Sequence, residues 1–154
     1  MSVDALVSLQ LAEDYRKLPV EDHGKIRFAS FEMPPITVAS DAGSTIDLVK
    51  LPAGRVRVLP SFSRVQTSAF GASRVLDIGH TAYLSADATT EAADDDAFTP
   101  TALDISSATA DLKLGTALDF DLYSKAGVLV QALVSGGTIP IGATLKGFIA
   151  YVYE

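Results

Sequence analysis

Residues 55–58 read Arg-Val-Arg-Val, the cleanest alternation of polar and apolar side chains in the chain. Successive side chains of a β-strand point to opposite faces, so Arg55 and Arg57 share one face and the two valines share the other. The same period of two recurs in residues 45–49 (Thr-Ile-Asp-Leu-Val), and residues 74–78 (Arg-Val-Leu-Asp-Ile) are another predicted strand. Alternation of this kind predicts half-buried β-strands.

Strand patterns separated by turn clusters continue in both directions from this stretch. Further strands are predicted at residues 25–28, 36–38, 61–68, 102–105, 118–122, 128–134 and 144–153. Short strands with frequent turns, and no helical segments between them, favour an all-β antiparallel β-sandwich or jelly-roll-like barrel with two sheets of four strands. Meander barrels and immunoglobulin-like sandwiches are alternatives. The last two strands are apolar on both faces, so we expect them to be either central or buried at a subunit contact.

The first residues follow a different period. Val3, Val7, Leu11, Tyr15 and Leu18 recur at steps of four and three, with Leu6 beside them and Pro19 after them. This spacing predicts a short amphipathic helix that ends before the proline. We therefore divide the chain into an N-terminal arm or helix at 1–23 and a β domain at 24–154. Because one apolar stripe does not stabilise an isolated helix, the arm must pack on its own domain, on a sister subunit or on another protein.

Composition restricts the function. Of the 154 residues, 48% are hydrophobic and 20% are charged, with a formal net charge of -7, and residues 78–154 hold three basic and ten acidic side chains. This balance disfavours a nucleic-acid partner, whose phosphates need cationic side chains. Cysteine is absent, so disulfides and thiolate metal sites are excluded. The sequence shows neither a secretory signal pattern nor an apolar run of about 20 residues, so we expect no membrane partner and synthesis in the cytoplasm.

The sequence offers only weak candidates for a catalytic site or a metal site. His23 and His80 are the two histidines, and a Ser85–His80–Asp77 triad lacks a nucleophile elbow. Two distant histidines also do not form a transition-metal site. Residues 86–100 predict a long exposed acidic loop, and the consecutive aspartates at 94–96 lack the alternate spacing of a calcium loop. We therefore expect no enzyme activity, no metal and no cofactor.

A group of arginines is the most prominent candidate for binding. Arg55, Arg57, Arg64 and Arg74 lie within twenty positions and make up four of the 12 basic residues. One interpretation is a solvated sheet face. The other is a docking surface for an acidic protein partner, because arginine forms bidentate pairs with carboxylates.

Three stretches resemble small head decoration (cement) proteins of tailed bacteriophages. They are Leu-Pro-Ala-Gly-Arg-Val at 51–56, Gly-Gly-Thr-Ile-Pro at 136–140, and the apolar strand that ends in Tyr-Val-Tyr at 151–153. The likeness covers residues 24–154. It implies a jelly-roll-like β domain on the capsid exterior of a virion, where a dimer or trimer bridges major capsid protein subunits, and it implies no catalytic residue.

The candidate contact residues combine the N-terminal stripe with the arginines. They are Val3, Leu6, Leu11, Tyr15, Arg55, Arg57, Arg64 and Arg74. The main alternative function is a carbohydrate-binding or host-adhesion β-sandwich of a phage spike or fibre, which would present exposed aromatic side chains to sugars. A small cupin-like enzyme is a third alternative, but it would need a histidine cluster around a metal.

Overall fold

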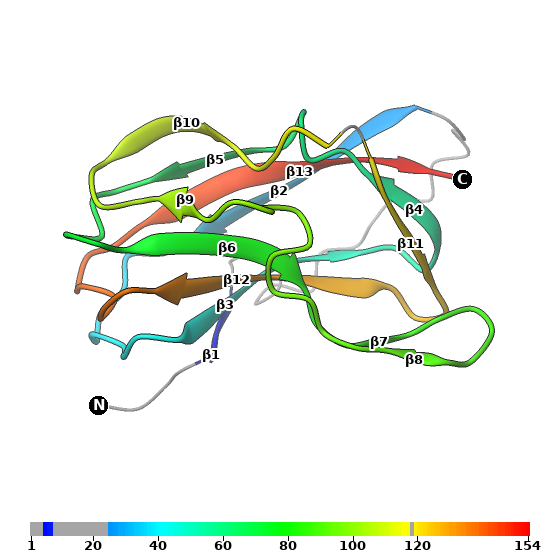
Figure 1. The fold of residues 1–154 in the computed structure, drawn as a ribbon, viewed down its shortest axis with the longest axis horizontal. Coiled ribbons are helices and arrows are strands. Elements are labelled where there is room, and N and C mark those ends of the chain that lie inside the picture. Colours follow the sequence, from blue (N-terminus) through cyan, green and yellow to red (C-terminus); the bar gives the residue numbers. More distant parts are fainter. Residues whose placement is uncertain (1–4, 8–24, 118) are drawn as a thin grey trace.

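The computed structural model describes residues 5–7, 25–117 and 119–154, and these residues form thirteen β-strands and no helix. Figure 1 shows the strands in two stacked sheets. In chain order the strands are β1 (Ala5–Val7), β2 (Ile26–Met33), β3 (Ser44–Leu51), β4 (Gly54–Val58), β5 (Arg64–Thr67), β6 (Val75–His80), β7 (Tyr83–Leu84), β8 (Thr90–Glu91), β9 (Leu103–Asp104), β10 (Thr109–Lys113), β11 (Phe120–Ser124), β12 (Val128–Ser135) and β13 (Leu145–Tyr153). Within the described ranges there is no helix of the length and apolarity needed to cross a membrane.

One layer, which we call sheet A, has the strand order β1-β3-β12-β6-β9. The other layer, sheet B, has the order β10-β5-β13-β4-β11, with β2 paired to β13 as a sixth strand. β7 and β8 form a separate two-stranded hairpin. The all-β sandwich prediction is confirmed, but the sheets contain five and six strands rather than four each. The jelly-roll connection pattern stays a prediction.

The two C-terminal strands lie in the middle of their sheets, as their apolar composition predicts. β12 pairs with β3 on one edge and with β6 on the other. β13 pairs with β2 from Leu145 to Val152, and its other edge is shared by β5 at 145–148 and β4 at 151–153. β13 therefore joins the two halves of sheet B, so the C-terminal strand is central to the fold.

The hydrophobic core fills the space between the two sheets. Its largest fully buried side chains include Phe31, Phe70, Phe98, Ile46, Leu48 and Leu76. In β12 the side chains alternate between buried and half-buried along all eight residues. This is the pattern of a strand with one face on the core.

The structure corrects two expectations outside the main strands. Residues 5–7 form β1, which pairs parallel with β3 through the Leu6–Ile46 position, so the helix predicted there is wrong at these residues. A strand is favoured at this point because the edge of β3 offers hydrogen-bond partners to an extended chain. The rest of the predicted helix lies outside the described residues.

The predicted exposed loop at 86–100 is partly folded into the sandwich. Asp94 and His80 exchange two backbone hydrogen bonds, at 2.8 and 3.0 Å. Phe98 and Thr99 are fully buried, and the Thr99 hydroxyl accepts a hydrogen bond from the Ile78 N–H at 2.7 Å. Residues 87–96, which contain β8 and the aspartates, are exposed as predicted, and so is Pro100.

Candidate interaction surface

The outer face of sheet B carries Arg55 and Arg57 of β4. Val56 and Val58 are buried, at 1% and 0% exposure, whereas the two arginines point away from the core. The prediction that both arginines share one strand face is therefore confirmed.

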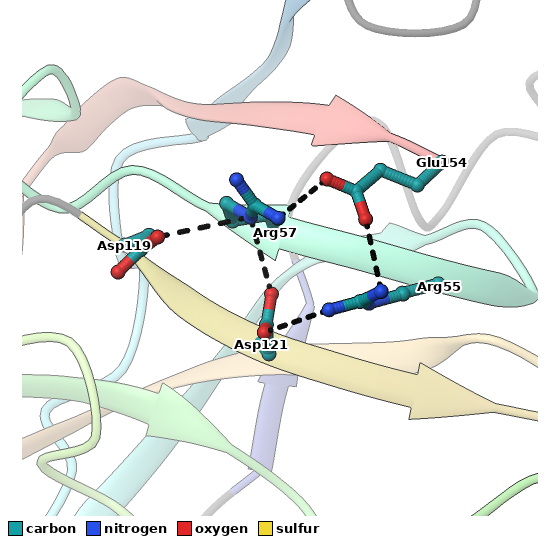
Figure 2. Close-up of polar contacts among 5 residues, drawn as sticks. All are labelled: Arg55, Arg57, Asp119, Asp121 and Glu154. Atoms are coloured by element: carbon teal, nitrogen blue, oxygen red, sulfur yellow. Dashed lines mark hydrogen bonds and ion pairs between the residues drawn. The ribbon is translucent and has the colours of Figure 1, made fainter.

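Arg55 and Arg57 form ion pairs within the chain (Figure 2). The β4–β11 register places Arg57 opposite Asp121, and the Glu154 N–H donates to the Arg55 carbonyl at 3.0 Å. The Arg57 guanidinium lies 2.6 Å from Glu154, 3.3 Å from Asp121 and 3.7 Å from Asp119. Arg55 lies 3.3 Å from both Asp121 and Glu154. We call these five residues the ion-pair cluster.

The ion-pair cluster changes the interpretation of the arginines. The side chains of Arg55 and Asp121 are about half exposed, at 50% and 52%. Exposed ion pairs each stabilise a fold by about 0–1 kcal/mol, because water screens them well. An acidic partner would therefore compete with carboxylates that already neutralise Arg55 and Arg57. The cluster is better suited to the polar rim of a contact than to its centre.

The other two arginines mainly donate hydrogen bonds to backbone carbonyls of loops. Arg64 in β5 donates to the carbonyls of Ser61 and Ser63 at 2.8 and 2.9 Å and pairs with Asp111 at 3.1 Å. Arg74, just before β6, donates to the carbonyls of Ala72 and Thr138 at 2.7 and 3.2 Å. Arg64 faces outward on sheet B, whereas Arg74 is attached to sheet A, so the four arginines do not form one patch.

An apolar stripe lies beside the ion-pair cluster. The stripe consists of Ile26, Phe28, Phe148 and Val152, on β2 and β13. The register aligns Ile26 with Val152, and Val152 in turn with Arg57. Phe28 is 63% exposed, and its ring meets that of Phe148 edge-on at 5.2 Å between centroids. Sequence reasoning missed this stripe, because only the register shows that these four side chains share an outer face.

A shallow groove of about 600 Å³ adjoins the stripe. It crosses β2, β13, β5 and β10, and its lining includes Ser30, Glu32, Gln66, Asp111, Lys146 and Phe148. The lining combines side chains of both charges and neutral polar side chains with the aromatic residues Phe31 and Phe148. A surface with this mixture suits a polypeptide contact better than a single charged small molecule.

The histidine predicted at a strand end is buried. His80 is 5% exposed, and its ring lies among those of Tyr83, Phe98 and Phe120, with centroids 5.3–6.2 Å away. The Ser85 hydroxyl, weighed above as a triad nucleophile beside His80, donates to Asp87 and to the Thr89 carbonyl. Across the part of the chain that the structure describes, no group of three or more His, Cys, Asp or Glu side chains could hold a metal ion.

The N-terminal candidates are described only at one position. Leu6 lies in β1 beside Ile46 of β3. Val3, Leu11 and Tyr15 lie outside the described residues. The contact role of Val3, Leu11 and Tyr15 therefore stays a prediction.

Two solved structures with a similar fold come from phage capsids. A chain in the capsid of Ralstonia phage GP4 superposes with a TM-score of 0.69 at 19% identity, covering 98% of this chain and 99% of that chain. This β-sandwich fold occurs in phage capsids. A chain in the cyanophage Pam1 capsid asymmetric unit gives a TM-score of 0.53 at 14% identity, covering 92% of this chain and 96% of that chain. In sequence, neither a protein-family model nor a curated protein matches the chain.

Proposed function

We propose that this chain is a non-enzymatic virion structural protein that decorates and stabilises a phage capsid by bridging major capsid protein subunits. The observation that carries the proposal is the full-length likeness to a chain in the capsid of Ralstonia phage GP4. That chain has about the same length as this one, because the match covers nearly all of both. A small β-sandwich of this kind suits a component added to a shell.

Charge supports a position on the outside of the shell. The net charge is -7, and the interior of a filled phage head is crowded with DNA phosphates. Like charges repel at close range, so packaged DNA would repel an acidic protein. A position on the exterior avoids this repulsion, and salt there screens the protein's own charge.

The outer face of sheet B fits a protein contact. Specific interfaces combine an apolar centre with a polar rim. Here the apolar stripe supplies the centre, and the ion-pair cluster supplies a rim in which each arginine keeps a carboxylate partner. A homo-oligomer, dimer or trimer, would repeat this contact, and many weak contacts on a shell add up to strong attachment.

The N-terminal arm belongs to the same proposal. Residues 1–23 act as a docking arm for the β domain at 24–154, with Val3, Leu11 and Tyr15 as contact side chains. The β1–β3 pairing places the beginning of this arm at the edge of sheet A. Arms of this kind add contact area without enlarging the folded domain.

Binding to phage heads that lack this protein tests the proposal. Wild-type protein is mixed with such heads, which are then sedimented, and bound protein is quantified. We expect saturable binding that weakens at least tenfold for Phe28→Asp, whose side chain is mostly exposed. Leu84→Asp, at an exposed apolar position on β7 outside both the stripe and the ion-pair cluster, is the control and should bind nearly as well as wild type. Absence of wild-type binding would contradict the proposal.

Exposed aromatic side chains keep a second function open. Phe28, Phe62 and Tyr123 are 63%, 53% and 59% exposed, and sugar-binding surfaces stack such rings on glycans. In this alternative the chain is a carbohydrate-binding or host-adhesion module of a spike or fibre. Saturable binding to purified host glycans, without binding to heads, would favour it.

A further inference from the structure

The loop segments at the two ends of the sandwich differ in charge. Residues 34–43, 68–74 and 136–144, which link β2–β3, β5–β6 and β12–β13, meet at one end, and we call them the loop end (at the left of Figure 1). These three segments contain only Asp41 and Arg74 as charged residues. At the opposite end, residues 81–97 contain five acidic and no basic side chains.

Two aliphatic side chains project from the loop end. Val38 and Ile141 are 69% and 68% exposed, the largest exposures among the bulky hydrophobic residues that the structure describes. They lie on neighbouring segments, because Ser40 pairs with Ile139 on one side of them and the Ile36 N–H donates to the Ala143 carbonyl on the other. Exposed aliphatic side chains that lie together mark contact sites more often than scattered ones do.

The loop end is held in one conformation by its own hydrogen bonds. The Gly142 N–H donates to the Ile36 carbonyl at 2.7 Å, and the Thr144 N–H donates to the Ser68 hydroxyl at 2.9 Å. Arg74 ties the third segment to the others through its bond to the Thr138 carbonyl. A preformed surface loses little conformational entropy when it binds, so even a small apolar contact contributes to affinity.

We propose that the loop end docks on an uncharged, apolar patch of the capsid shell protein, an inference that rests on the function proposed above. The low charge of this end, where the three segments carry only Asp41 and Arg74, makes burial inexpensive because few ionised groups lose water. The same orientation turns the acidic end at 81–97 away from the shell. The contact is separate from the outer face of sheet B, and bridging two subunits requires two such contacts.

The small exposed apolar area of the loop end favours the shell over a second copy of this chain. Its bulky exposed hydrophobic side chains, Val38 and Ile141, offer on the order of 100 Å² each, whereas a stable dimer buries about 800 Å² on each partner. An apolar contact this small does not hold a dimer together in solution by itself. It becomes effective when it acts together with other contacts on a repeating lattice.

The test compares charged variants at the two ends of the sandwich. The double variant Val38→Asp/Ile141→Asp introduces charge at the loop end, and Leu84→Asp introduces charge at the exposed β7 position of the acidic end. Both should melt close to the wild type. With heads that lack this protein, we expect wild type and L84D to bind alike and the double variant to bind at least tenfold more weakly. Val38→Ser/Ile141→Ser should give an intermediate loss without added charge.

The outcomes separate this inference from the function on which it rests. If wild type binds heads and the double aspartate variant binds equally well, the loop-end inference is overturned and the proposed function stands. If wild type does not bind heads, the proposed function fails and the inference fails with it. If sedimentation without heads shows a wild-type oligomer that the aspartate variant dissociates, the loop end contacts a second copy, and the inference is again overturned.

Discussion

Gly54 of β4 lies directly against the ring of Tyr153 of β13. A Cβ atom at position 54 would lie 2.9 Å from the Tyr153 hydroxyl oxygen, and the φ angle of Gly54 is +106°. This contact joins the Leu-Pro-Ala-Gly turn at 51–54 to the C-terminal Tyr-Val-Tyr at 151–153, two stretches that lie far apart in the sequence. Glycine is required at this position both by the backbone conformation and by the ring.

Gly54→Ala should destabilise the protein by about 1–3 kcal/mol, because alanine would adopt a strained φ and displace the Tyr153 ring. Urea unfolding of wild type and variant gives the difference directly. Gly43→Ala is the control, since Gly43 also has a positive φ (+82°), but a Cβ atom there would meet no atom of the described residues within 4 Å. Equal losses at the two positions would show that the Tyr153 contact contributes nothing.

A second glycine, Gly79, allows the backbone of the acidic segment around Asp94 to lie close against sheet A. A Cβ at Gly79 would lie 1.8 Å from the Asp94 carbonyl oxygen, which is backbone and cannot swing away. Gly79→Ala should therefore displace the segment around Asp94 and cost about 1–3 kcal/mol, the usual range for overpacking. Hydrogen exchange should accelerate at the His80 and Asp94 amides, which bond to each other's carbonyls. Unchanged exchange at these amides would refute this account of the segment.

Strands in which polar and apolar residues alternate were predictable from the sequence. Strands that form because a neighbouring strand pairs with them were not. Residues 45–49 and 55–58 reveal their buried faces without any knowledge of neighbours. Thr109–Lys113 has polar and exposed side chains for most of its length, and it forms β10 because the edge of β5 pairs with it. Leu6 shows the opposite error, since a helical spacing was outweighed by backbone pairing along β3.

The candidate surface was predictable only in part for the same reason. Alternation alone placed Arg55 and Arg57 on one face. Their partners Asp121 and Glu154 are far away in the sequence, and only the β4–β11 and β4–β13 registers bring them together. Phe98 lies in the segment predicted to be an exposed loop, because one aromatic residue in an acidic stretch forms no periodic pattern, yet it is fully buried.

The closest pair of the ion-pair cluster should contribute little to stability. Arg57 and Glu154 lie 2.6 Å apart, with side chains 35% and 30% exposed. A double-mutant cycle with Arg57→Ala and Glu154→Gln should give a coupling free energy of about 1 kcal/mol or less. This coupling should fall as salt rises, because ions screen exposed pairs. A coupling that is several times larger, or one that is insensitive to salt, would mean that the cluster stabilises the sandwich itself.

Asp77 should make the stability depend on pH. Burial raises the pKa of the Asp77 carboxyl, and the nearby charges of Asp96 and Asp95 raise it further. The ionised form is thus disfavoured in the folded state, so stability falls as pH rises from the unfolded pKa through the raised folded pKa. Asp77→Asn should melt at a higher temperature than wild type at pH 7, and the difference should vanish below about pH 4.

Thermal melts between about pH 3 and pH 8 test this dependence. Asp95→Asn removes one of the repelling charges and should give a smaller gain of the same sign. If Asp77→Asn gained equally at the acidic and neutral ends of this range, its effect would come from packing or hydrogen bonding instead of from ionisation.

Cryo-electron microscopy of virions of the phage that encodes this protein is the most direct measurement of its proposed role. The account predicts density for this β-sandwich at repeated positions on the outer surface of the shell, in contact with more than one major capsid protein subunit. Density confined to a spike or fibre, or a virion without this chain, would contradict it.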